Sequence, residues 1–367
     1  MFKGLIKRAF GRQYQPLNRV EISGDNLKSN YRTLSKICKK VKVAPVLKSN
    51  AYGHGLKEVA KALDGVGAPF FCVDSIHEAY TLKKSGIKTK ILVMGYVDAK
   101  NLKFRRADFS FAAYGIGHFM DLMAVQPNAG IHIFVDTGMG REGIPMAELV
   151  RSIGKIPDKF VGNIEGVMSH FAASEDPDDP RTRTQVANFK EAIGMFLKRG
   201  IRPKWIHMAN SSGLINCRKL KMDKLTNMAR CGIATYGIDP EGTGKKLLPA
   251  TKLITHVVQV KDVYAGNTVG YGFTYTAKKD IKIAVLPIGY NDGVDRELSN
   301  RGIAYIRGSA CRIIGRVSMN ITVVEVSGLE MVSVGDVAVI DYIIPSKGKI
   351  PYEFLIHLNP AIKRVLV

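Results

Sequence analysis

The sequence predicts an α/β protein in which a (β/α)8 barrel of the TIM type is followed by a mostly antiparallel C-terminal β domain. Short apolar runs alternate with amphipathic stretches from about residue 40 to residue 240. After residue 246, apolar runs follow one another without long helices between them. Small and polar residues gather directly after several of the earlier runs, where the active sites of such barrels lie. A doubly wound sheet is disfavoured, because no G-x-G-x-x-G opens the first helix.

Eight strand-and-helix units in about 200 residues form the pattern expected of a parallel barrel. Amphipathic segments that predict helices lie between most of the strands, for example Leu56–Leu63, Ile76–Lys84 and Arg181–Arg199. The predicted strands are, in chain order, Val43–Leu47, Phe70–Val73, Ile91–Gly95, Phe109–Tyr114, Ile131–Asp136, Ile164–Ser169, Trp205–Ala209 and Arg230–Tyr236.

The pattern changes after the loop-like segment Pro240–Lys246. We expect a barrel domain over residues 26–240 and a β domain over residues 241–367, to which the early run Asn18–Ile22, within residues 1–25, adds a strand. The strands predicted for this second domain are Ile254–Val260, Ile281–Leu286, Ile303–Ile306, Arg312–Val317, Ile321–Val326 and Val337–Asp341.

Composition narrows the class of protein. With 367 residues, of which 46% are hydrophobic, the chain has the composition of a soluble globular protein, and no stretch approaches the length of a membrane span. The basic N-terminus lacks the apolar core of a secretory signal. The five cysteines, an odd number without CxxC spacing, favour a reducing cytoplasm over a disulfide framework or a zinc site. The net charge of +22 is scattered, so nucleic-acid binding is the weakest interpretation and a solvated basic surface the strongest.

One lysine stands out chemically. Lys48 ends the first apolar run and is followed by the small-residue turn Ser49–Gly55, which contains Tyr52. A lysine buried at the mouth of a strand can lose its proton and bond covalently to a carbonyl group. Pyridoxal phosphate (PLP) is the commonest such carbonyl compound in metabolism, and it also needs a site for its phosphate. A surface lysine after an edge strand is the simpler alternative, so the other strand ends must decide.

Polar residues follow the later strands as well. Backbone N–H groups and a hydroxyl near the ends of the seventh and eighth strands suit a phosphate dianion. Taken singly, each segment has a simpler explanation: His170 as a hydrogen-bonded core histidine, Asn210 as a helix cap, and Arg141 as a surface residue. Their joint placement favours a site. The segments are Asp136–Arg141, Ser169–Phe171, Ala209–Gly213 and Arg230–Ile233.

These motifs, in this order and over nearly the whole chain, resemble the alanine racemase family of fold-type III PLP enzymes. The resemblance continues beyond the barrel into the β domain, and motifs in this order are highly specific. Its motifs are Lys48–Gly55, Asp136–Arg141 with Gly143, Ser169–Ala172, Ala209–Ser211, Arg230–Gly237, Gly270–Gly272, Thr274–Thr276, Pro287–Tyr290, Asp292–Gly293 and Gly315–Met319.

The resemblance implies a two-base racemase of small amino acids, most simply one that interconverts L-alanine and D-alanine for peptidoglycan precursors. Lys48 would carry PLP and act as the base on one face of the substrate Cα. Tyr271, supplied by the other subunit of a homodimer, would act on the opposite face, since racemisation needs a proton to leave one face and arrive at the other. His170 would bond this tyrosine and link it to Arg230, which would face the pyridine nitrogen of PLP.

The resemblance also implies the residues that hold cofactor and substrate. Arg141 and the backbone of Met319, the latter from the partner subunit, would bind the substrate carboxylate. The phosphate of PLP would be bound by Tyr52, Asn210, Ser211, Gly232 and Ile233.

Three positions depart from the family pattern. Phe134 stands where many alanine racemases have a carbamylated lysine, whose anion braces the substrate-binding arginine. Asn320 replaces an aspartate, and Pro360 stands where a phosphate-contacting tyrosine is expected. Arg141 must then find another partner, a bound anion or greater freedom. We therefore hypothesise slower alanine turnover or a relaxed substrate range that extends to serine. A fold-type III decarboxylase and a non-catalytic PLP-binding protein remain as alternatives.

Overall fold

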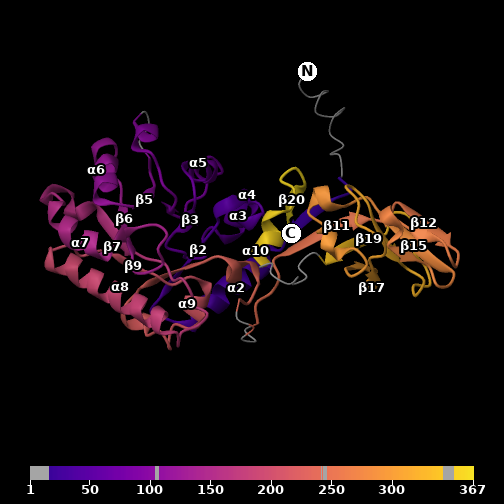
Figure 1. The fold of residues 1–367 in the computed structure, drawn as a ribbon. Helices are drawn as coiled ribbons and strands as arrows, with labels where there is room; N and C mark the ends of the chain where they lie inside the picture. The colour runs from indigo at the N-terminus through magenta and orange to yellow at the C-terminus, as the bar shows by residue number, and fades with distance from the viewer. Residues whose placement is uncertain (1–15, 104–106, 241, 243–245, 342–350) are drawn as a thin grey trace, which may run out of the picture. The chain divides into compact units, whose positions relative to one another are not determined.

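The computed structural model describes residues 16–103, 107–240, 242, 246–341 and 351–367 (Figure 1). The basic N-terminal tail, and most of the Pro240–Lys246 segment, lie outside the described residues. The chain divides into two compact units. One consists of Ser23–Ala250 with Leu366, and the other joins the residues up to Ile22 with Thr251–Val365 and Val367.

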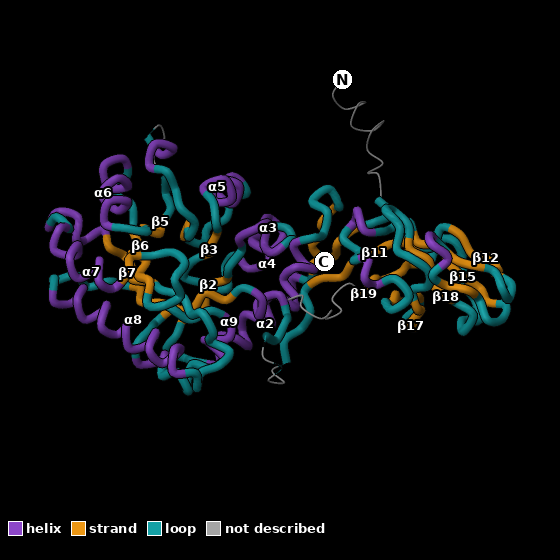
Figure 2. The backbone as a smooth tube through the Cα atoms, viewed as in Figure 1, coloured by secondary structure: helices purple, strands orange, loops and turns teal. Residues whose placement is uncertain are grey.

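The first unit contains a parallel sheet that curls into a nearly closed barrel (Figure 2). Its eight strands follow one another around the barrel, and a single parallel bridge between Val46 and Cys72 joins the first to the second. This confirms the predicted fold class. In spatial order the strands are β2 (Lys42–Pro45), β10 (Met228–Cys231), β9 (Trp205–His207), β8 (Ile164–Met168), β6 (Ile131–Asp136), β5 (Ser110–Ala113), β4 (Ile91–Val93) and β3 (Phe71–Val73), with the two-residue β7 (Ile144–Pro145) beside β6.

Burial explains why these runs form barrel strands. In β3, β4, β5 and β10 every residue is buried, as expected for parallel strands that are covered on both faces. Side chains from β2 and β10 and from the neighbouring strands meet in a packed interior. One cluster of this interior consists of Ala44, Val46, Phe70, Cys72, Leu92 and Met228.

Helices connect most of the strands. Side-chain caps fix where several begin: Ser23 accepts from the Asn26 N–H, and Ser75 from the Glu78 N–H, both at 3.2 Å. The predicted helices Leu56–Leu63 and Ile76–Lys84 are observed with those bounds. The helices of this unit are α2 (Gly24–Ile37), α3 (Lys48–Tyr52), α4 (Leu56–Leu63), α5 (Ile76–Lys84), α6 (Ile116–Val125), α7 (Met146–Ser152), α8 (Pro180–Lys198), α9 (Ser211–Ile215) and the 3-10 helices η1 (Ala99–Leu102), η2 (Ile153–Lys155), η3 (Asp158–Asn163), η4 (Met222–Lys224) and η5 (Ile233–Tyr236).

The eighth predicted strand, Arg230–Tyr236, is wrong in its second half. Strand β10 ends at Cys231, and a 3-10 helix begins at Ile233. Gly232 lies between them with φ −96° and ψ −93°, a combination that breaks the ladder. Apolar content alone does not reveal such a break, because the residues on both sides of it are buried.

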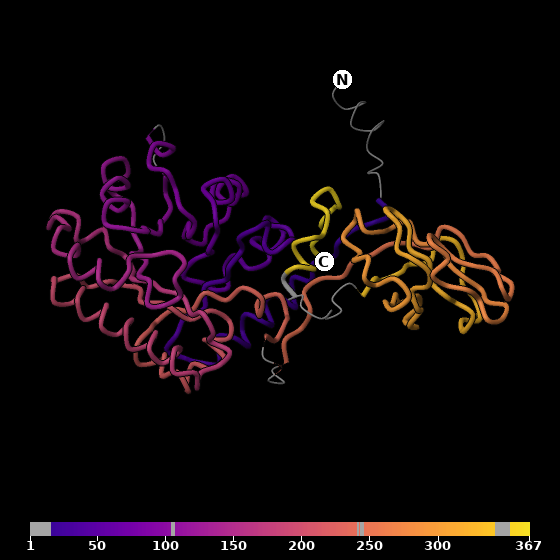
Figure 3. The backbone as a smooth tube through the Cα atoms, viewed as in Figure 1, coloured from indigo at the N-terminus to yellow at the C-terminus, as the bar shows by residue number. Residues whose placement is uncertain are grey.

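The second unit is built from antiparallel strands. Strand β1 (Arg19–Ile22), from the start of the chain, pairs with β11 (Thr251–His256), as the indigo segment among the orange strands in Figure 3 shows. The larger sheet has the order β17 (Ser309–Arg312), β16 (Ile303–Ile306), β19 (Val337–Asp341), β11, β1 and β20 (Lys363–Leu366). Smaller sheets consist of β12 (Gln259–Val263), β15 (Ile281–Leu286) and β18 (Thr322–Glu325), and of β13 (Thr268–Val269) with β14 (Tyr275–Thr276). The helices here are α10 (Pro351–Ile356), η6 (Tyr271–Phe273), η7 (Tyr290–Asp292) and η8 (Arg296–Leu298).

Two strand predictions in this unit are wrong. The run Ile254–Val260 belongs to two strands in different sheets, because the backbone N–H groups of Val257 and Val258 turn to different partners. The run Arg312–Val317 ends its strand at Arg312, and Gly315 follows with a φ of 70° that no extended strand contains. None of the described helices combines the length and apolar character needed to cross a bilayer.

Candidate active site

The predicted site residues of the barrel follow the carboxyl ends of its strands. Lys48 lies three residues beyond the end of β2, and its Nζ lies 3.9 Å from Oδ1 of Asp74, which follows β3. The Lys48 side chain is 39% exposed, so it is half-open to solvent rather than buried as the lysine argument supposed. Both residues therefore lie at the end of the barrel where catalytic groups of this fold gather.

The turn after Lys48 has an unusual backbone. Four successive residues, Ser49–Tyr52, have φ between 52° and 55°, so α3 is a left-handed turn along most of its length. Such a backbone costs about 1–2 kcal/mol for each residue other than glycine. Asn50 secures it from both sides: its N–H donates to Glu78 Oε1 at 2.9 Å, and its Oδ1 accepts from the Leu56 N–H at 2.9 Å. The sequence analysis identified a turn here but not its left-handed backbone, since Asn50 and Gly53 favour such a backbone only as single residues.

The left-handed turn directs Tyr52 toward the start of η5. A Cβ atom on Gly232 would lie 2.6 Å from the Tyr52 hydroxyl oxygen, so only glycine leaves room for the phenol. Tyr52 also packs on Tyr236, whose ring centroid is 5.4 Å away and whose hydroxyl donates to the Val46 carbonyl at 2.7 Å. The structure thus brings Tyr52, Gly232 and Ile233 together as predicted from the motifs.

The segment after β9 joins the same region. Asn210 caps α9: its Oδ1 accepts from the Gly213 N–H at 2.9 Å and from the Ser174 hydroxyl at 2.7 Å. Asn210 is therefore a helix cap, as the simpler interpretation of the sequence expected. Ser211, 3% exposed, accepts the Ala234 N–H at 3.4 Å and so connects the ends of β9 and β10.

Arg230 is the most deeply embedded charge of the site. Its Nη2 donates to the Ser169 carbonyl at 2.6 Å and lies 3.0 Å from His170 Nδ1, while Nη1 lies 2.6 Å from His207 Nδ1. The side chain is 4% exposed, and burial lowers its pKa to about 10. Because a guanidinium only donates hydrogen bonds, both histidine nitrogens that face it must be acceptors.

The electrostatics keep His170 neutral. Burial, followed by the charge of Arg230, lowers the pKa of His170 to about 3, and the more distant charges of Arg141 and Lys48 act in the same direction. With Nδ1 accepting from Arg230, the ring proton is on Nε2. His170 therefore presents an N–H donor on its far side, which suits an oxygen partner such as a tyrosine hydroxyl.

Arg141 has a partner that the sequence prediction did not identify. Its Nε donates to Glu142 Oε2, and its Nη2 to Glu142 Oε1 at 2.8 Å, which is a bidentate ion pair with the next residue. The preceding loop is ordered by Asp136, whose Oδ1 accepts from the N–H groups of Gly138 and Met139 at 2.9 Å. The Arg141 side chain is 53% exposed, so it is held by Glu142 and remains accessible from solvent.

Phe134 lies in apolar surroundings. It is 5% exposed and clusters with Ala112 and Met168, with Tyr114 against them at a ring-centroid distance of 5.7 Å. A brace for Arg141 therefore comes from the loop carboxylate of Glu142 and not from position 134.

Tyr271 and Met319 belong to the β unit, and each is described within that unit. Tyr271 begins η6 and is 72% exposed, while Met319 is 56% exposed. The glycines beside Tyr271 lie against Arg316, whose backbone N would be 3.2 Å from a Cβ on Gly270. The tyrosine turn therefore packs on the segment that precedes Met319. Two departures from the family pattern are exposed here as well, Asn320 and Pro360.

No group of three or more His, Cys, Asp or Glu side chains with the geometry of a metal site occurs in the described part of the chain. All five cysteines are free and buried.

Family models match almost the whole chain. The alanine racemase N-terminal domain matches residues 22–240, and the alanine racemase C-terminal domain matches residues 250–366. The chain is 33% identical over 370 residues to alanine racemase 2 of Caldanaerobacter subterraneus subsp. tengcongensis, covering 95% of this chain and 94% of that protein. It is 35% identical over 329 residues to the alanine racemase of Symbiobacterium thermophilum, covering 88% and 86%.

Solved structures have the same architecture. Alanine racemase from D-cycloserine-producing Streptomyces lavendulae superposes with a TM-score of 0.85 at 28% identity, over 97% of this chain and 98% of that one. Alanine racemase from Bartonella henselae with covalently bound pyridoxal phosphate gives 0.79 at 27% identity, over 96% and 100%. A barrel followed by a β unit, with a lysine at the end of the first barrel strand, thus defines a barrel enzyme of the racemase type. The chain belongs to the alanine racemase family.

Proposed function

We propose that the protein is a PLP-dependent amino-acid racemase that interconverts L-alanine and D-alanine. One observation carries the proposal: in a chain of this family, Lys48, the neutral ring of His170 and the cationic Arg230 lie at one end of the barrel. An amine at a strand end and a fixed proton donor are groups that a racemase needs.

The barrel residues fit the cofactor. Gly232 has no side chain where a Cβ would meet the Tyr52 hydroxyl, so the phenol lies directly beside the start of η5. The Ser211 hydroxyl lies beside the same turn, on the Ala234 N–H. Hydroxyl groups and the N–H end of a turn are suitable partners for a phosphate dianion. Tyr52, Ser211, Gly232 and Ile233 would hold the phosphate, with Asn210 fixing the loop by its cap.

When bound, PLP withdraws electrons from the substrate Cα and so makes its proton acidic. Lys48 would anchor the cofactor and then exchange a proton with one face of Cα. Tyr271 of the partner subunit would exchange a proton with the other face. This assigns a homodimer in which each site is completed in trans by Tyr271 and Met319. Because tyrosine is a weak acid, it requires a hydrogen-bonded setting, which the Nε2–H of His170 would supply.

Arg230 would face the ring nitrogen of the cofactor. A permanent cation with donor hydrogens keeps that nitrogen unprotonated, which limits how far the substrate electrons are drawn into the ring. The contacts with Ser169 and His207 support this role, since they leave the guanidinium little freedom to turn. Arg230 would thereby disfavour side reactions such as transamination, which need more electron withdrawal by the ring.

Arg141 would bind the substrate carboxylate, together with the Met319 backbone of the partner subunit. The bidentate ion pair with Glu142 keeps the guanidinium of Arg141 in place. In the cell, the reaction would supply D-alanine for peptidoglycan precursors, and we assign it to the cytoplasm on the odd number of cysteines and their lack of CxxC spacing.

The test follows racemisation and proton exchange together. Purified protein is incubated with PLP and single L-amino acids in deuterated water, and D-isomer formation is measured beside Cα deuteration. We expect D-alanine, with visible absorbance of the cofactor that disappears in Lys48→Ala. A decarboxylase would release carbon dioxide instead, and a binding protein would give neither product nor exchange. If the wild type neither shows that absorbance nor racemises alanine, the proposal fails.

Subunit exchange tests the assignment in trans. Lys48→Ala and Tyr271→Phe should each be inactive, yet an equal mixture should recover about a quarter of wild-type activity, since half of the dimers are mixed and each has one complete site. A mixture of Lys48→Ala with the Lys48→Ala, Tyr271→Phe double variant is the matched control and should stay inactive. No recovery in the first mixture, with subunit exchange verified, would show that Tyr271 acts within its own chain.

A further inference from the structure

A line of polar side chains crosses the barrel interior from Arg230 to Glu165. Arg230 Nη1 lies 2.6 Å from His207 Nδ1, and His207 Nε2 lies 2.7 Å from His132 Nδ1. His132 Nε2 then faces Glu165 Oε2 at 3.7 Å. Both histidines are fully buried, and no closer acceptor meets His132 Nε2 in the described residues. The line therefore connects the carboxyl end of the strands with their amino end.

The hydrogen positions along this line follow from one fixed donor. Arg230 can only donate, so His207 Nδ1 accepts and the His207 proton is on Nε2. That proton points at His132 Nδ1, which must accept in turn, so the His132 proton is on Nε2 and points at Glu165. The carboxylate is an acceptor and ends the series. Each neutral ring thus has one tautomer that satisfies both of its neighbours.

Charge and burial agree with this order. Burial lowers the pKa of His207 well below its ordinary value, and it also lowers the pKa of His132, so both rings are neutral. For Glu165, burial acts upward, but the nearby His132 ring and the hydrogen bond from Ser110 outweigh it and lower the pKa of the carboxyl to about 2. The line has a cation at one end, an anion at the other, and two polarisable rings between them.

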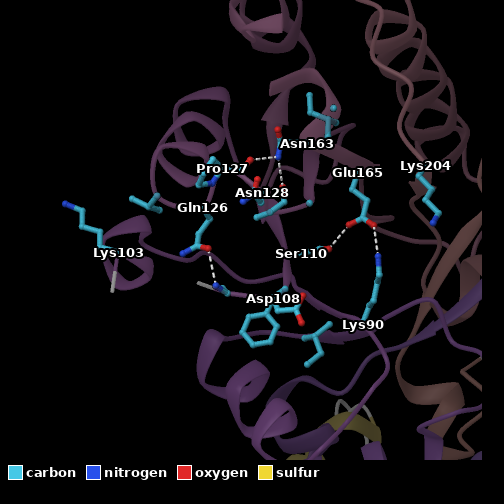
Figure 4. A pocket seen from close by; sticks show the side chains of 18 of the residues that line it. Lys90, Lys103, Asp108, Ser110, Gln126, Pro127, Asn128, Asn163, Glu165 and Lys204 are labelled. Atoms are coloured by element: carbon cyan, nitrogen blue, oxygen red, sulfur yellow. Dashed lines mark hydrogen bonds and ion pairs between the residues drawn. The ribbon is translucent and has the colours of Figure 1, made fainter. Parts of the chain in front are cut away.

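Neighbouring residues hold the Glu165 carboxylate in place. Glu165 borders a cavity of about 680 Å³ near the amino ends of the strands. Figure 4 shows its carboxylate between Ser110, whose hydroxyl donates to Oε2 at 2.6 Å, and Lys90, whose Nζ lies 3.7 Å from Oε1. A Cβ on Gly130 would overlap Glu165, and one on Gly166 would overlap His132. Glycine at both positions therefore leaves the space that these two side chains occupy.

We propose that Glu165, His132 and His207 are positioning residues that hold the Arg230 guanidinium in one orientation, with N–H donors ordered along the line from Arg230 toward Glu165. The part of the inference that concerns the cofactor rests on the proposed function. The hydrogen order belongs to the barrel alone and exists without cofactor. Glu165 acts through the two rings and never touches the reacting atoms.

The hydrogen order is tested by nitrogen-15 NMR of histidine-labelled protein without cofactor, with assignments from His132→Asn and His207→Asn. Both rings are expected to be neutral with the proton on Nε2. A proton on Nδ1 of either ring, or a doubly protonated ring, would overturn the order. Because this measurement uses no cofactor, it stands even if the wild type fails to bind PLP, an outcome that would instead remove the proposed function.

The positioning role is tested by PLP titration of Glu165→Gln, which keeps the shape and an acceptor oxygen but removes the charge. We expect about fivefold weaker cofactor binding and a shifted His207 Nδ1 resonance, since the carboxylate charge polarises the two buried rings that hold Arg230. Ser110→Ala is the matched control, because it removes a bond to the same carboxylate and leaves the charge; it should bind PLP within about twofold of wild type.

Glu165→Asp keeps the charge and should restore most of the affinity and the wild-type His207 resonance. Urea unfolding of all three variants shows whether each is folded before binding is compared. Equal losses in Glu165→Gln and Glu165→Asp, or a Glu165→Gln variant that behaves as Ser110→Ala does, would mean that the carboxylate only fills space, and the proposal would be wrong.

Discussion

The hydroxyl of Tyr52 lies so close to Gly232 that a Cβ on the glycine would be 2.6 Å from the phenol oxygen. Tyr52 is directed there by a left-handed turn and is held against Tyr236. The end of β10 and the turn after β2 therefore constrain each other's sequence, although almost 180 residues separate them.

Gly232→Ala is expected to displace the Tyr52 phenol. Overpacking of this kind costs about 1–3 kcal/mol, so PLP binding should weaken by about fivefold to 150-fold. Absorbance titration with PLP measures the change. Gly117→Ala, on helix α6 with open space at its Cβ, is the control and should bind PLP normally. Unchanged binding in Gly232→Ala would contradict the proposed phosphate site.

The free energy of unfolding should fall as the solution is made acidic. Burial and the charge of Arg230 lower the pKa of His170 to about 3, whereas an unfolded histidine titrates near pH 6.5. Between these values the unfolded chain binds more protons, so stability is present above about pH 6.5 and is lost as pH falls. Each such histidine contributes up to about 1.4 kcal/mol per pH unit. The buried His132 and His207 act in the same direction.

Urea unfolding of wild type and His170→Asn between about pH 7 and pH 5 measures this slope. Asparagine keeps an acceptor near the position of Nδ1, and the slope should be shallower by about 1 kcal/mol per pH unit. The exposed His77 provides a control, since His77→Asn should leave the slope as it is. Parallel curves for wild type and His170→Asn would argue against a buried neutral His170.

Glu142→Gln should weaken the hold of Arg141 on substrate. Loss of the bidentate partner lets the guanidinium turn away, so we expect KM for alanine to rise about threefold to tenfold with little change in kcat. Stability should change by less than about 1 kcal/mol, because the pair is half-exposed. Steady-state kinetics with alanine and serine measure both KM and preference. Glu148→Gln, an exposed carboxylate on α7, is the control. A lower KM in Glu142→Gln would mean that the carboxylate competes with substrate instead of bracing Arg141.

Ser49→Gly should stabilise the protein by about 0.5–1 kcal/mol. Ser49 has a φ of 55°, which glycine adopts without strain, and the relief exceeds the entropy that glycine loses on folding. Ser29→Gly, in the right-handed helix α2, should instead destabilise by about 0.5 kcal/mol. Urea denaturation compares the two. Destabilisation of similar size at both positions would show that the turn stores no strain at Ser49.

Local pattern was sufficient for much of the fold. The runs Ile131–Asp136 and Ile281–Leu286 were predicted with the bounds of β6 and β15, since each is a mostly apolar run of six residues that polar or turn residues bound. The errors occur where apolar residues continue through a break. Arg230–Tyr236 is buried throughout, so only the backbone at Gly232 reveals where the strand ends.

The sequence also predicted which strand ends form the candidate site, because the barrel rule places them together. It could not predict the left-handed turn after Lys48 or the ion pair of Arg141 with Glu142, which depend on tertiary contacts. The contacts that join Arg230 to Glu165 through two histidines could not be predicted from the sequence either. The residues involved are far apart in the chain and each reads as an ordinary core or surface residue. The roles of Tyr271 and Met319 in trans remain predictions.

Because Arg141 pairs with its immediate neighbour, the anion that braces it does not depend on a small molecule from solution. A brace assembled on a lysine needs dissolved carbon dioxide, and it is lost when the gas is removed or the solution is acidified. A carboxylate encoded next to Arg141 comes with the polypeptide at synthesis. Because Phe134 is apolar and has no amine to carbamylate, the affinity for substrate would be the same in a degassed buffer as in a carbonated one.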